Sequence, residues 1–236
     1  MTDICLRRPG VLPLNPTGAE GPRPHERRGV FVTGTDTGIG KTLVSACLVR
    51  AWTAVYWKPV QTGSAFEVGD TATVAALADV PPDRLLTPRH RLQAPLSPQA
   101  AALLETVDIT LDDFVLPTID RPLVVEGAGG VLVPLSDDAL IIDLIERLAL
   151  PVVVVARTGL GTINHTLLTL MALRTRGLVV AGIVLSGAPN PGNRAALERF
   201  GAVPVLAELP RLPQVDAAAV TRLATERIPA LLSLLP

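Results

Sequence analysis

Gly34-Thr35-Asp36-Thr37-Gly38-Ile39-Gly40-Lys41-Thr42 is the stretch of sequence that decides the fold. A short apolar run, Val30–Val32, precedes it, and a helical pattern over 41–52 follows it. Strand, glycine-rich loop, Gly-Lys-Thr and helix form the arrangement of a phosphate-binding loop (P-loop). In such a loop several backbone N–H groups point at phosphate oxygens, and the start of the helix adds a positive dipole. We therefore expect Lys41 to lie against terminal phosphates and the Thr42 hydroxyl to bind Mg²⁺.

The spacing of this loop departs from the strict Walker pattern. Gly34 lies six residues before Gly40, one residue more than that pattern allows. An ordinary glycine turn that caps a helix is the alternative. The position of the loop between a strand and a helix favours the phosphate-binding interpretation.

Apolar runs alternate with helical patterns along the rest of the chain. This alternation predicts an α/β fold, a single P-loop NTPase-like domain with a mostly parallel sheet and helices on both faces. We expect 81–98 to be irregular. The expected strands are 30–32, 54–60, 123–125, 152–155, 179–185 and 203–207, and the expected helices are 41–52, 70–78, 99–106, 140–148, 162–176, 194–200 and 217 onward.

Composition excludes several classes of protein. Of 236 residues, 48% are hydrophobic and 18% are charged, which is enough apolar material for a packed core, and the net charge of −1 argues against a broad basic surface for nucleic acid. Two cysteines, Cys5 and Cys47, make no disulfide framework or zinc pattern. The apolar runs are too short to span a bilayer. We expect a soluble cytoplasmic protein in which 1–28, rich in Pro and Arg, is an extension and 29–236 is the domain.

Two more polar segments follow predicted strands. Lys58-Pro-Val-Gln-Thr-Gly63 contains a lysine that can neutralise a transferring phosphoryl group, and Glu126-Gly-Ala-Gly-Gly130 begins with a carboxylate that can hold Mg²⁺. Because ligands bind beyond the carboxyl ends of parallel strands, both segments should converge with the P-loop. Taken alone, each segment has an equally good alternative interpretation. Lys58 could be a surface lysine before a turn, and Glu126 could be an incidental acid at a strand-to-loop turn. Asp70, at the start of a predicted helix, is a second acidic ligand or an N-cap, and the cap is the simpler interpretation.

Together these segments resemble the dethiobiotin synthetase family. The resemblance covers about Val30 to Gln214, and it includes a fourth motif, Leu160-Gly-Thr-Ile-Asn-His165. The P-loop of that family has the same extra residue. The resemblance implies an ATP-dependent cyclo-ligase of biotin biosynthesis with Mg²⁺ as cofactor. Its substrates would be diaminopelargonic acid, CO₂ or bicarbonate, and ATP, with other nucleoside triphosphates as possible replacements.

The resemblance also implies the chemistry and the residues that perform it. CO₂ adds to one amine to give a carbamate, ATP phosphorylates the carbamate, and the neighbouring amine closes a cyclic urea with loss of phosphate. Lys58 and Lys41 would be catalytic, and Thr42, Asp70 and Glu126 would surround Mg²⁺. Thr62 and Thr37 would contact the diamine or carbamate. The implied nucleotide-binding residues are Gly38, Ile39, Gly40, Lys41, Thr42, Leu43, Asp70, Glu126, Gly127, Ala128, Gly129, Ser186, Gly187, Ala207, Glu208 and Leu209.

The fourth motif opens a predicted helix. In the family this helix start receives the substrate carboxylate across a dimer interface, so the resemblance implies a homodimer whose site needs both subunits. The N–H groups of Gly161, Thr162, Ile163 and Asn164 are suited to an anion. His165 has no apparent carboxylate partner, which favours a packing or supporting role over catalysis.

One pair of residues departs from the family pattern. Members often carry Asn-Asp where this chain has Ser186-Gly187, and the Asn contacts the edge of adenine. A buried Asn amide offers both a donor and an acceptor, whereas Ser offers one hydroxyl and Gly no side chain. We therefore expect weaker selection for adenine here.

Three other classes of protein are alternatives to the dethiobiotin synthetase family. A partitioning ATPase of the ParA/MinD kind shares the fold, but it carries a lysine where this chain has Asp36. Cobyrinic acid amide synthetases add a glutaminase domain, for which residues 190–236 leave no room. A non-enzymatic nucleotide-binding module predicts nucleotide binding without turnover that depends on the diamine.

Overall fold

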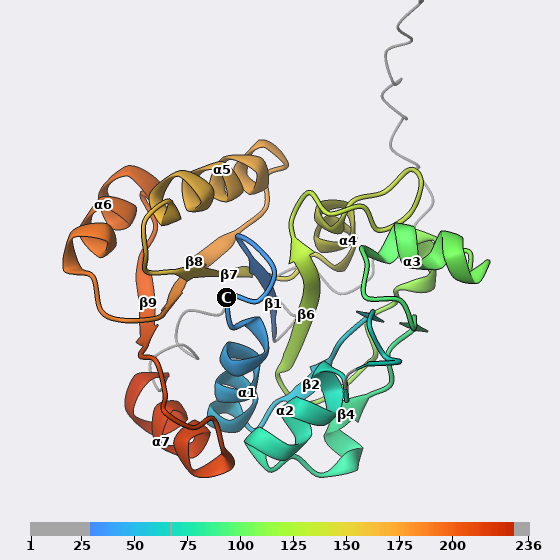
Figure 1. Ribbon diagram of the computed structural model, residues 1–236, viewed down its shortest axis with the longest axis horizontal. Coiled ribbons are helices and arrows are strands. Elements are labelled where there is room, and N and C mark those ends of the chain that lie inside the picture. The colour runs from blue at the N-terminus through green and yellow to red at the C-terminus, as the bar shows by residue number, and fades with distance from the viewer. Residues whose placement is uncertain (1–28, 67, 229–236) are drawn as a thin grey trace, which may run out of the picture.

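The computed structural model describes residues 29–66 and 68–228, so the expected extension over 1–28 lies outside the described residues. Seven parallel strands form the central sheet (Figure 1). Long aliphatic runs such as Val152–Ala156 are fully buried, as expected of parallel strands covered on both faces. In spatial order the strands are β4 (Leu85–Leu86), β2 (Val55–Trp57), β6 (Leu123–Gly130), β1 (Gly29–Gly34), β7 (Val152–Arg157), β8 (Val180–Ser186) and β9 (Val205–Leu209).

Helices cover the sheet on both sides and separate the core into two clusters. The cluster on one side contains buried residues from α1, α2 and α7, and the other contains residues from α3, α4, α5 and α6. This confirms the predicted α/β fold class. The helices are α1 (Lys41–Trp52), α2 (Asp70–Ala78), α3 (Pro98–Glu105), α4 (Ile141–Leu148), α5 (Thr162–Thr175), α6 (Pro191–Gly201) and α7 (Ala217–Arg227), with single turns of 3₁₀ helix at η2 (Pro82–Arg84) and η3 (Leu111–Asp113).

The alternation of side chains along each strand decides which cluster a residue joins. On β2, Val55 and Trp57 pack in the cluster of α3 to α6, whereas Tyr56 packs with α1, α2 and α7. On β1, Phe31 and Val32 divide in the same way. The side chain at each strand end therefore has a fixed direction.

The strand expected over 54–60 is two strands in the structure. Main-sheet strand β2 ends at Trp57, and β3 (Val60–Gln61) pairs with β5 (His90–Arg91) in a separate two-stranded sheet. Pro59 lies between β2 and β3 and has no N–H to give to a ladder. The region 81–98, expected to be irregular, contributes η2, β4 and β5.

Other boundaries differ by a few residues. Strand β6 continues to Gly130, five residues beyond the expected end, because the glycine-rich segment stays extended beside β1. Helix α1 ends as expected without a glycine: Thr53 takes a left-handed φ of 53° and donates its N–H to the carbonyl of Val49. Within the described residues, none of the helices has the length and apolarity that a bilayer-spanning segment needs.

Candidate functional site

A cleft of about 720 Å³ lies at the carboxyl ends of β1, β2 and β6. The three polar segments identified in the sequence all contribute to its wall, which confirms that they converge. Residues Pro95 to Pro98 and Phe66 form another part of the wall. From the sequence-predicted set, the lining residues are Thr37, Gly38, Gly40, Lys41, Thr42, Lys58, Thr62, Asp70, Glu126, Ala128 and Gly129.

The P-loop has the backbone geometry that its glycines predict. Gly38 and Gly40 have φ values of 69° and 97°, in the left-handed region that glycine adopts without strain. Gly40 is the N-cap of α1 and supplies no side-chain cap. The start of α1 therefore presents backbone N–H groups and a positive dipole end to the cleft, which suits an anion.

Lys41 is buried and turned back along its own loop. Its side chain is 7% exposed, and its Nζ donates to the carbonyl oxygen of Asp36 at 2.9 Å. Burial, helped by the positive charge of Lys58, lowers the pKa of Lys41 to about 8. Among the described residues the hydrogen bond given for this ammonium is to a neutral carbonyl, which leaves the ammonium well suited to bind an incoming phosphate.

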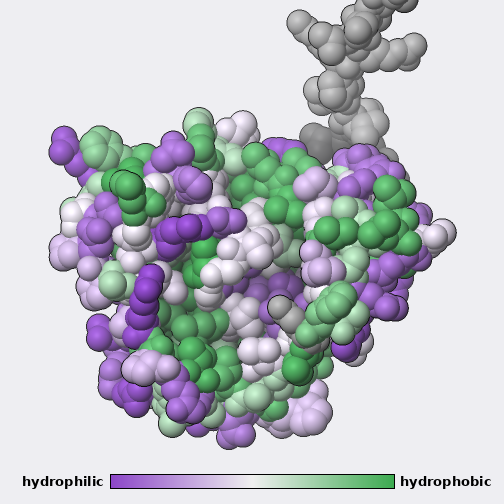
Figure 2. All heavy atoms as spheres, viewed as in Figure 1, coloured by the Kyte–Doolittle hydropathy of each residue, from purple (hydrophilic) through white to green (hydrophobic). Residues whose placement is uncertain are grey.

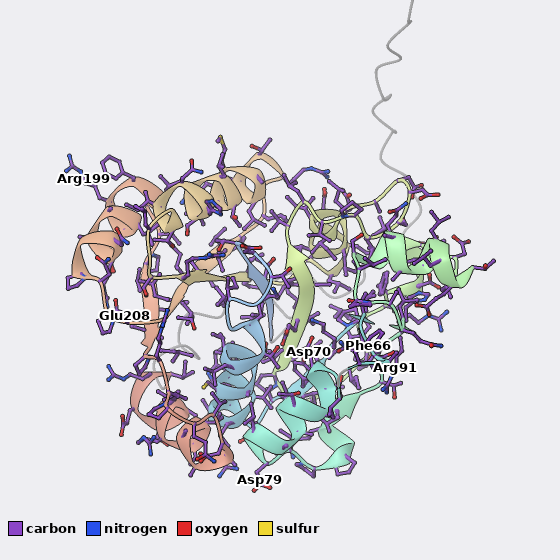
Figure 3. The ribbon with its side chains drawn as sticks, in the orientation of Figure 1. Phe66, Asp70, Asp79, Arg91, Arg199 and Glu208 are labelled. Carbon is purple, nitrogen blue, oxygen red and sulfur yellow. The ribbon has the colours of Figure 1, made fainter. Side chains whose placement is uncertain are left out.

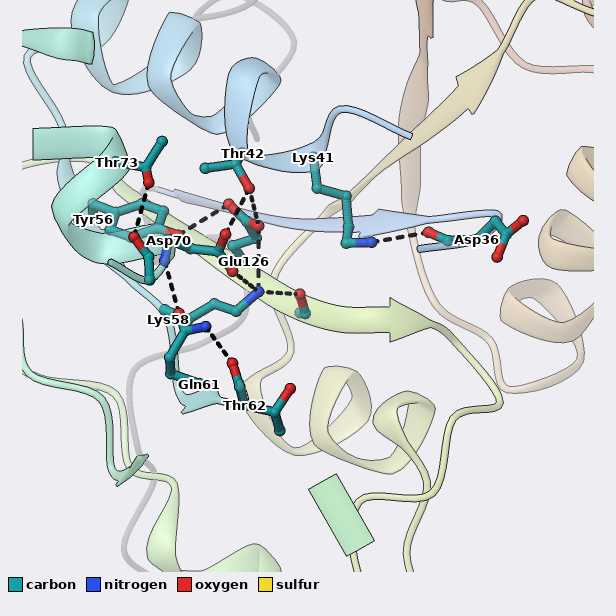
Figure 4. A network of polar contacts seen from close by, with 12 residues as sticks. Asp36, Lys41, Thr42, Tyr56, Lys58, Gln61, Thr62, Asp70, Thr73 and Glu126 are labelled. Carbon is teal, nitrogen blue, oxygen red and sulfur yellow. Dashed lines mark hydrogen bonds and ion pairs between the residues drawn. The ribbon is translucent and has the colours of Figure 1, made fainter. Parts of the chain in front are cut away.

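Three oxygen atoms meet across the cleft (Figure 4). The hydroxyl of Thr42 lies 2.9 Å from Asp70 Oδ1 and 3.0 Å from Glu126 Oε1. A hydroxyl has one proton and can donate to only one of the two carboxylates at a time, so the three oxygens are not fully satisfied by one another.

This oxygen set fits Mg²⁺, which prefers carboxylate and hydroxyl ligands and keeps further positions for phosphate oxygens and water. Among the described residues there is no cluster of three or more His, Cys, Asp or Glu side chains suited to a metal. If Mg²⁺ binds in this cleft, the convergence of the Thr42 hydroxyl with the carboxylates of Asp70 and Glu126 makes these the groups that could hold it.

Lys58 is the counter-charge of both carboxylates. Its Nζ lies 2.7 Å from Asp70 Oδ2 and 3.3 Å from Glu126 Oε1, and it donates to the carbonyl of Gly127 at 2.8 Å. Burial by itself disfavours the ammonium, but the two carboxylates outweigh it and raise the pKa of Lys58. The pKa of Asp70 is lowered because its contacts with Lys58 and Thr42 outweigh its own burial.

The N-cap interpretation of Asp70 is wrong. Gly69 is the N-cap of α2, and Asp70 is the first helical residue, with its carboxylate directed to Thr42 and Lys58. Gln61 holds this position: its Oε1 accepts the N–H of Asp70 at 2.8 Å, and its Nε2 donates to the carbonyl of Thr62 at 2.8 Å. We missed this role of Gln61 in the sequence, although it lies within the second motif.

Tyr56 is a second residue that sequence reasoning missed. Its side chain is completely buried, and its hydroxyl donates to Glu126 Oε2 at 3.0 Å. Burial and the negative charge of Glu126 raise the pKa of Tyr56 well above its ordinary value. The alternation Tyr56-Trp57-Lys58 was the available signal, because it puts Tyr56 and Lys58 on one side of β2.

Arg157 is a third such residue. It ends β7 and forms an ion pair with Asp36 in the P-loop, and its carbonyl accepts the hydroxyl of Thr162. The backbone N–H of Thr37 also donates to Asp36, and this hydrogen bond and the charge of Arg157 lower the pKa of Asp36. The end of β7 is therefore tied to both the P-loop and the start of α5.

The Leu160–His165 motif lies outside the main cleft. Gly161 is the N-cap of α5, and Asn164 lines a second pocket of about 480 Å³ together with Asp36. His165 lines this pocket and is exposed, so it does not pack in the core of this chain. Asp36 lines the same pocket, but its ion-pair partner is Arg157.

The residues expected around the nucleotide base lie on the other side of the P-loop. Ser186 is next to the loop, because a Cβ added to Gly40 would lie 2.8 Å from its Oγ. The side chains of Ala207 and Leu209 are buried in the core and cannot face a ligand, and Gly187 donates its N–H to the carbonyl of Leu209. Glu208 pairs with Arg194, and Figure 3 shows it on β9, across α1 from Asp70.

Three further residues of the predicted set lie beside the cleft but do not line it. Ile39 packs in the core at 7% exposure, and Leu43 is half-buried against the same cluster. Gly127 lies against the ring of Phe31, where a Cβ would come within 2.8 Å. Any contact of these residues with a nucleotide is therefore made through the backbone.

The parallel sheet, the P-loop and the cleft define a P-loop nucleotide-binding protein. A family model described as an AAA domain matches residues 28–219. Among solved structures, a ParA family ATPase from Chlorobium tepidum has a TM-score of 0.52 at 13% identity, covering 85% of this chain and 98% of its own. A MinC:MinD complex from Aquifex aeolicus has a TM-score of 0.50 at 9% identity, covering 87% of this chain and 94% of its own. At such identities the likeness shows the fold alone.

Curated relatives identify the family. The chain is 57% identical over 196 residues to the ATP-dependent dethiobiotin synthetase BioD of Paramagnetospirillum magneticum, covering 83% of this chain and 94% of that protein. It is 47% identical over 191 residues to BioD of Rhodopseudomonas palustris, covering 81% and 90%. It is 62% identical over 208 residues to the biotin biosynthesis bifunctional protein BioCD of Bordetella avium, covering 88% of this chain but 44% of that longer protein. The chain belongs to the ATP-dependent dethiobiotin synthetase family.

Proposed function

We propose that this protein closes the ureido ring of dethiobiotin from diaminopelargonic acid, CO₂ and ATP. CO₂ adds to one of two neighbouring amines, the carbamate oxygen takes the γ-phosphoryl group of ATP, and ADP leaves. The second amine then attacks the carbamoyl carbon, the C–O bond to phosphate breaks, and the cyclic urea forms. Family membership supports this reaction, and we assign it to the single domain over 29–236.

The observation that carries the proposal is the pair of buried ammonium groups in one cleft. Lys41 and Lys58 both line it, at 7% and 4% exposure. The reaction brings a carbamate and a γ-phosphate, both anionic, to close range, and positive charge placed in advance lowers the barrier to their reaction. General acid or base groups have little to do in this chemistry.

We assign each lysine to one substrate. Lys41 leaves the Asp36 carbonyl to bind the β- and γ-phosphates, together with the backbone N–H groups of the P-loop and the start of α1. Lys58, on the opposite wall of the cleft, neutralises the carbamate and the transferring phosphoryl group. Thr62 and Thr37 line the same space and supply hydrogen bonds to the diamine or carbamate.

Thr42, Asp70 and Glu126 would hold Mg²⁺, as their convergence supports. When bound, the ion supplies positive charge to the β- and γ-phosphate oxygens of ATP. Carboxylate charge that Lys58 now balances would then be shared with the ion, which leaves Lys58 free to contact the reacting groups.

We propose a homodimer in which the α5 start of one subunit serves the cleft of the other. Gly161 to Asn164 do not reach the cleft of their own chain. Leu160, Leu168 and Met171, on and beside α5, are 102%, 54% and 58% exposed, more apolar surface than one helix of a monomer ordinarily leaves in water. Leu103 and Leu104 on α3 are exposed as well, and hydrophobic residues gather over that helix in Figure 2. Exposure alone therefore does not choose the interface, and the placement of the α5 start is what favours α5.

Light scattering coupled to size exclusion tests the dimer. We expect twice the chain mass for the wild-type protein and a monomer for Met171→Glu. The matched change Leu104→Glu on α3 should leave the dimer intact. A wild-type monomer, or dissociation by Leu104→Glu alone, contradicts the assignment.

Phosphate release tests the reaction. Purified protein is given Mg²⁺, bicarbonate and ATP, with and without diaminopelargonic acid, and the product is weighed by mass spectrometry. We expect release that depends on the diamine and a product with the mass of the cyclic urea. Phosphate release at the same rate with and without the diamine would show that the protein is a different P-loop ATPase. A cytoplasmic location suits an enzyme that uses ATP as a co-substrate.

A further inference from the structure

Tyr56 lies in the middle of β2 and does not line the cleft. Its ring is fully buried among residues of α1, α2 and the neighbouring strands. Packing alone would be met by Phe, which has the same shape without the hydroxyl. A hydroxyl in this core is costly unless it has a partner, and the partner here is Glu126.

The strand register explains how the two residues meet. Strand β2 lies beside β6, with Tyr56 opposite Val124 and Trp57 opposite Val125. Glu126 is the next residue on β6, and its carboxylate lies between Tyr56 on its buried side and the cleft on the other.

The two oxygens of Glu126 have different partners. Oε2 accepts from the Tyr56 hydroxyl, whereas Oε1 lies against the hydroxyl of Thr42 and the ammonium of Lys58. Both Thr42 and Lys58 line the cleft, and Tyr56 does not. The hydrogen bond from Tyr56 therefore fixes the carboxylate with one oxygen toward the core and the other toward the ligands.

We propose that Tyr56 is a positioning residue that sets the Mg²⁺ affinity of the site through Glu126. This inference rests on the proposed function, because it assumes that Glu126 holds Mg²⁺. A carboxylate whose second oxygen is anchored loses no rotational freedom when it takes the ion. Partners of this kind, one step behind a metal ligand, change metal affinity by about 10- to 100-fold when they are removed.

Tyr56→Phe is the test, because it removes one oxygen and keeps the ring. ADP binding is measured by calorimetry at a series of Mg²⁺ concentrations and in EDTA. We expect the half-saturating Mg²⁺ concentration to rise about tenfold or more, while ADP affinity in EDTA stays at the wild-type value. A loss that is equal with and without Mg²⁺ would assign Tyr56 to general stability and overturn the inference.

Trp57→Phe is the matched control. Trp57 is the next residue on β2, is 5% exposed, and also loses one hydrogen bond when changed, from Nε1 to the carbonyl of Thr87 at 3.3 Å. It faces the opposite side of the sheet, so its Mg²⁺ dependence should match that of the wild-type protein. If Trp57→Phe also raised the half-saturating Mg²⁺ concentration tenfold, the loss of any hydrogen bond from β2 would produce the effect, and the inference on Tyr56 would be overturned.

A double variant separates action through Glu126 from an independent effect. If Tyr56 works only through that carboxylate, Tyr56→Phe adds no further loss of Mg²⁺ affinity to Glu126→Gln. Additive losses overturn the inference. If wild-type protein binds ADP with no Mg²⁺ dependence, the proposed metal site itself fails. If the wild-type protein shows the dependence and Tyr56→Phe does not alter it, only the inference on Tyr56 fails.

Discussion

Lys58 Nζ lies 2.7 Å from Asp70 Oδ2 and joins the end of the main-sheet strand β2 to the first residue of α2. The lysine side chain is only 5% exposed, and Glu126, its second acidic partner, is 1% exposed. The ammonium and the Glu126 carboxylate are thus buried together, whereas the side chain of Asp70 is 29% exposed. Lys58 and Thr42 lower the pKa of Asp70 against the effect of its burial, so positive and negative charges are already placed in the site before any ligand arrives.

Lys58→Met should destabilise the ligand-free protein by about 3 kcal/mol, because it leaves the buried carboxylate of Glu126 and the partly exposed carboxylate of Asp70 without their counter-charge. Mg²⁺ should restore part of that loss, since the ion can neutralise the same carboxylates. Urea unfolding in EDTA and in Mg²⁺ measures both effects. A variant as stable as wild type in EDTA would show that water already screens the pair.

Lys41→Ala should lower kcat by about 100-fold or more, because a charge contact to the transferring phosphoryl group is lost. The matched control is Arg50→Ala in the same helix, whose cation makes only a surface pair with Asp79 at 3.8 Å. Its activity should match that of the wild-type enzyme. Steady-state kinetics with ATP and the diamine measure kcat for both variants. A near-normal kcat for Lys41→Ala would exclude a catalytic role for Lys41.

Cys47 should resist alkylation in the folded protein. Burial raises the pKa of its thiol from 9.0 to about 12, so at pH 9 it holds about 500-fold less thiolate than an ordinary cysteine, and thiolate is the reactive form. Unfolding lets the thiol ionise from about pH 9, and this group therefore makes the folded state less stable as pH rises from 9 toward 12. Peptide mapping after iodoacetamide treatment, with and without urea, reads Cys47 directly. Equal labelling in both conditions contradicts the prediction.

The nucleotide base should be selected weakly. Ser186 offers one hydroxyl beside Gly40, at the position where the family pattern described above implies an Asn amide. We expect comparable kcat/KM values for ATP, CTP, GTP and UTP, and Ser186→Asn should raise the preference for ATP. A wild-type enzyme with strict ATP dependence would refute this.

Gly187, the second residue of the Ser186-Gly187 pair, cannot be replaced by the Asp of the family pattern without cost. Gly187 has φ 142°, and a Cβ there would come within 2.4 Å of the Thr158 hydroxyl. Gly187→Asp should therefore lower the unfolding free energy by at least about 1 kcal/mol, through strain at a backbone position that favours glycine. Thermal unfolding of this variant beside Ser186→Asn measures the difference.

Local patterns were enough to predict the P-loop and most elements. Glycines and a helix start within nine residues define the loop without help from the rest of the chain, and α1 begins and ends where the sequence places it. The convergence of Lys58 and Glu126 with that loop followed from the rule that ligands bind at the carboxyl ends of parallel strands. The division of the single strand expected over 54–60 was not predicted, although Pro59, which lacks a backbone donor, marks the point where it occurs.

The partners of the site residues needed three dimensions. Tyr56 and Glu126 are 70 residues apart, and only the register of β2 on β6 brings them together. A tyrosine in an apolar strand is ordinarily interpreted as a core residue, and Tyr56 is indeed buried in the core. Arg157 and Asp36 are 121 residues apart and meet because β7 lies beside β1. Such pairs depend on packing distances, which no local pattern contains.

The break at Pro59 divides the cleft mechanically. Lys58 stands at the end of a strand in the seven-stranded sheet, whereas Thr62 follows β3 in the separate pair with β5. Under the proposed function, the phosphate-binding residues thus belong to the seven-stranded sheet, whereas Thr62, one of the two threonines assigned to the diamine or carbamate, follows a strand of the small separate sheet. The contact of Thr62 with the diamine could therefore be altered by redesign of the β3–β5 pair, with the seven-stranded sheet left unchanged.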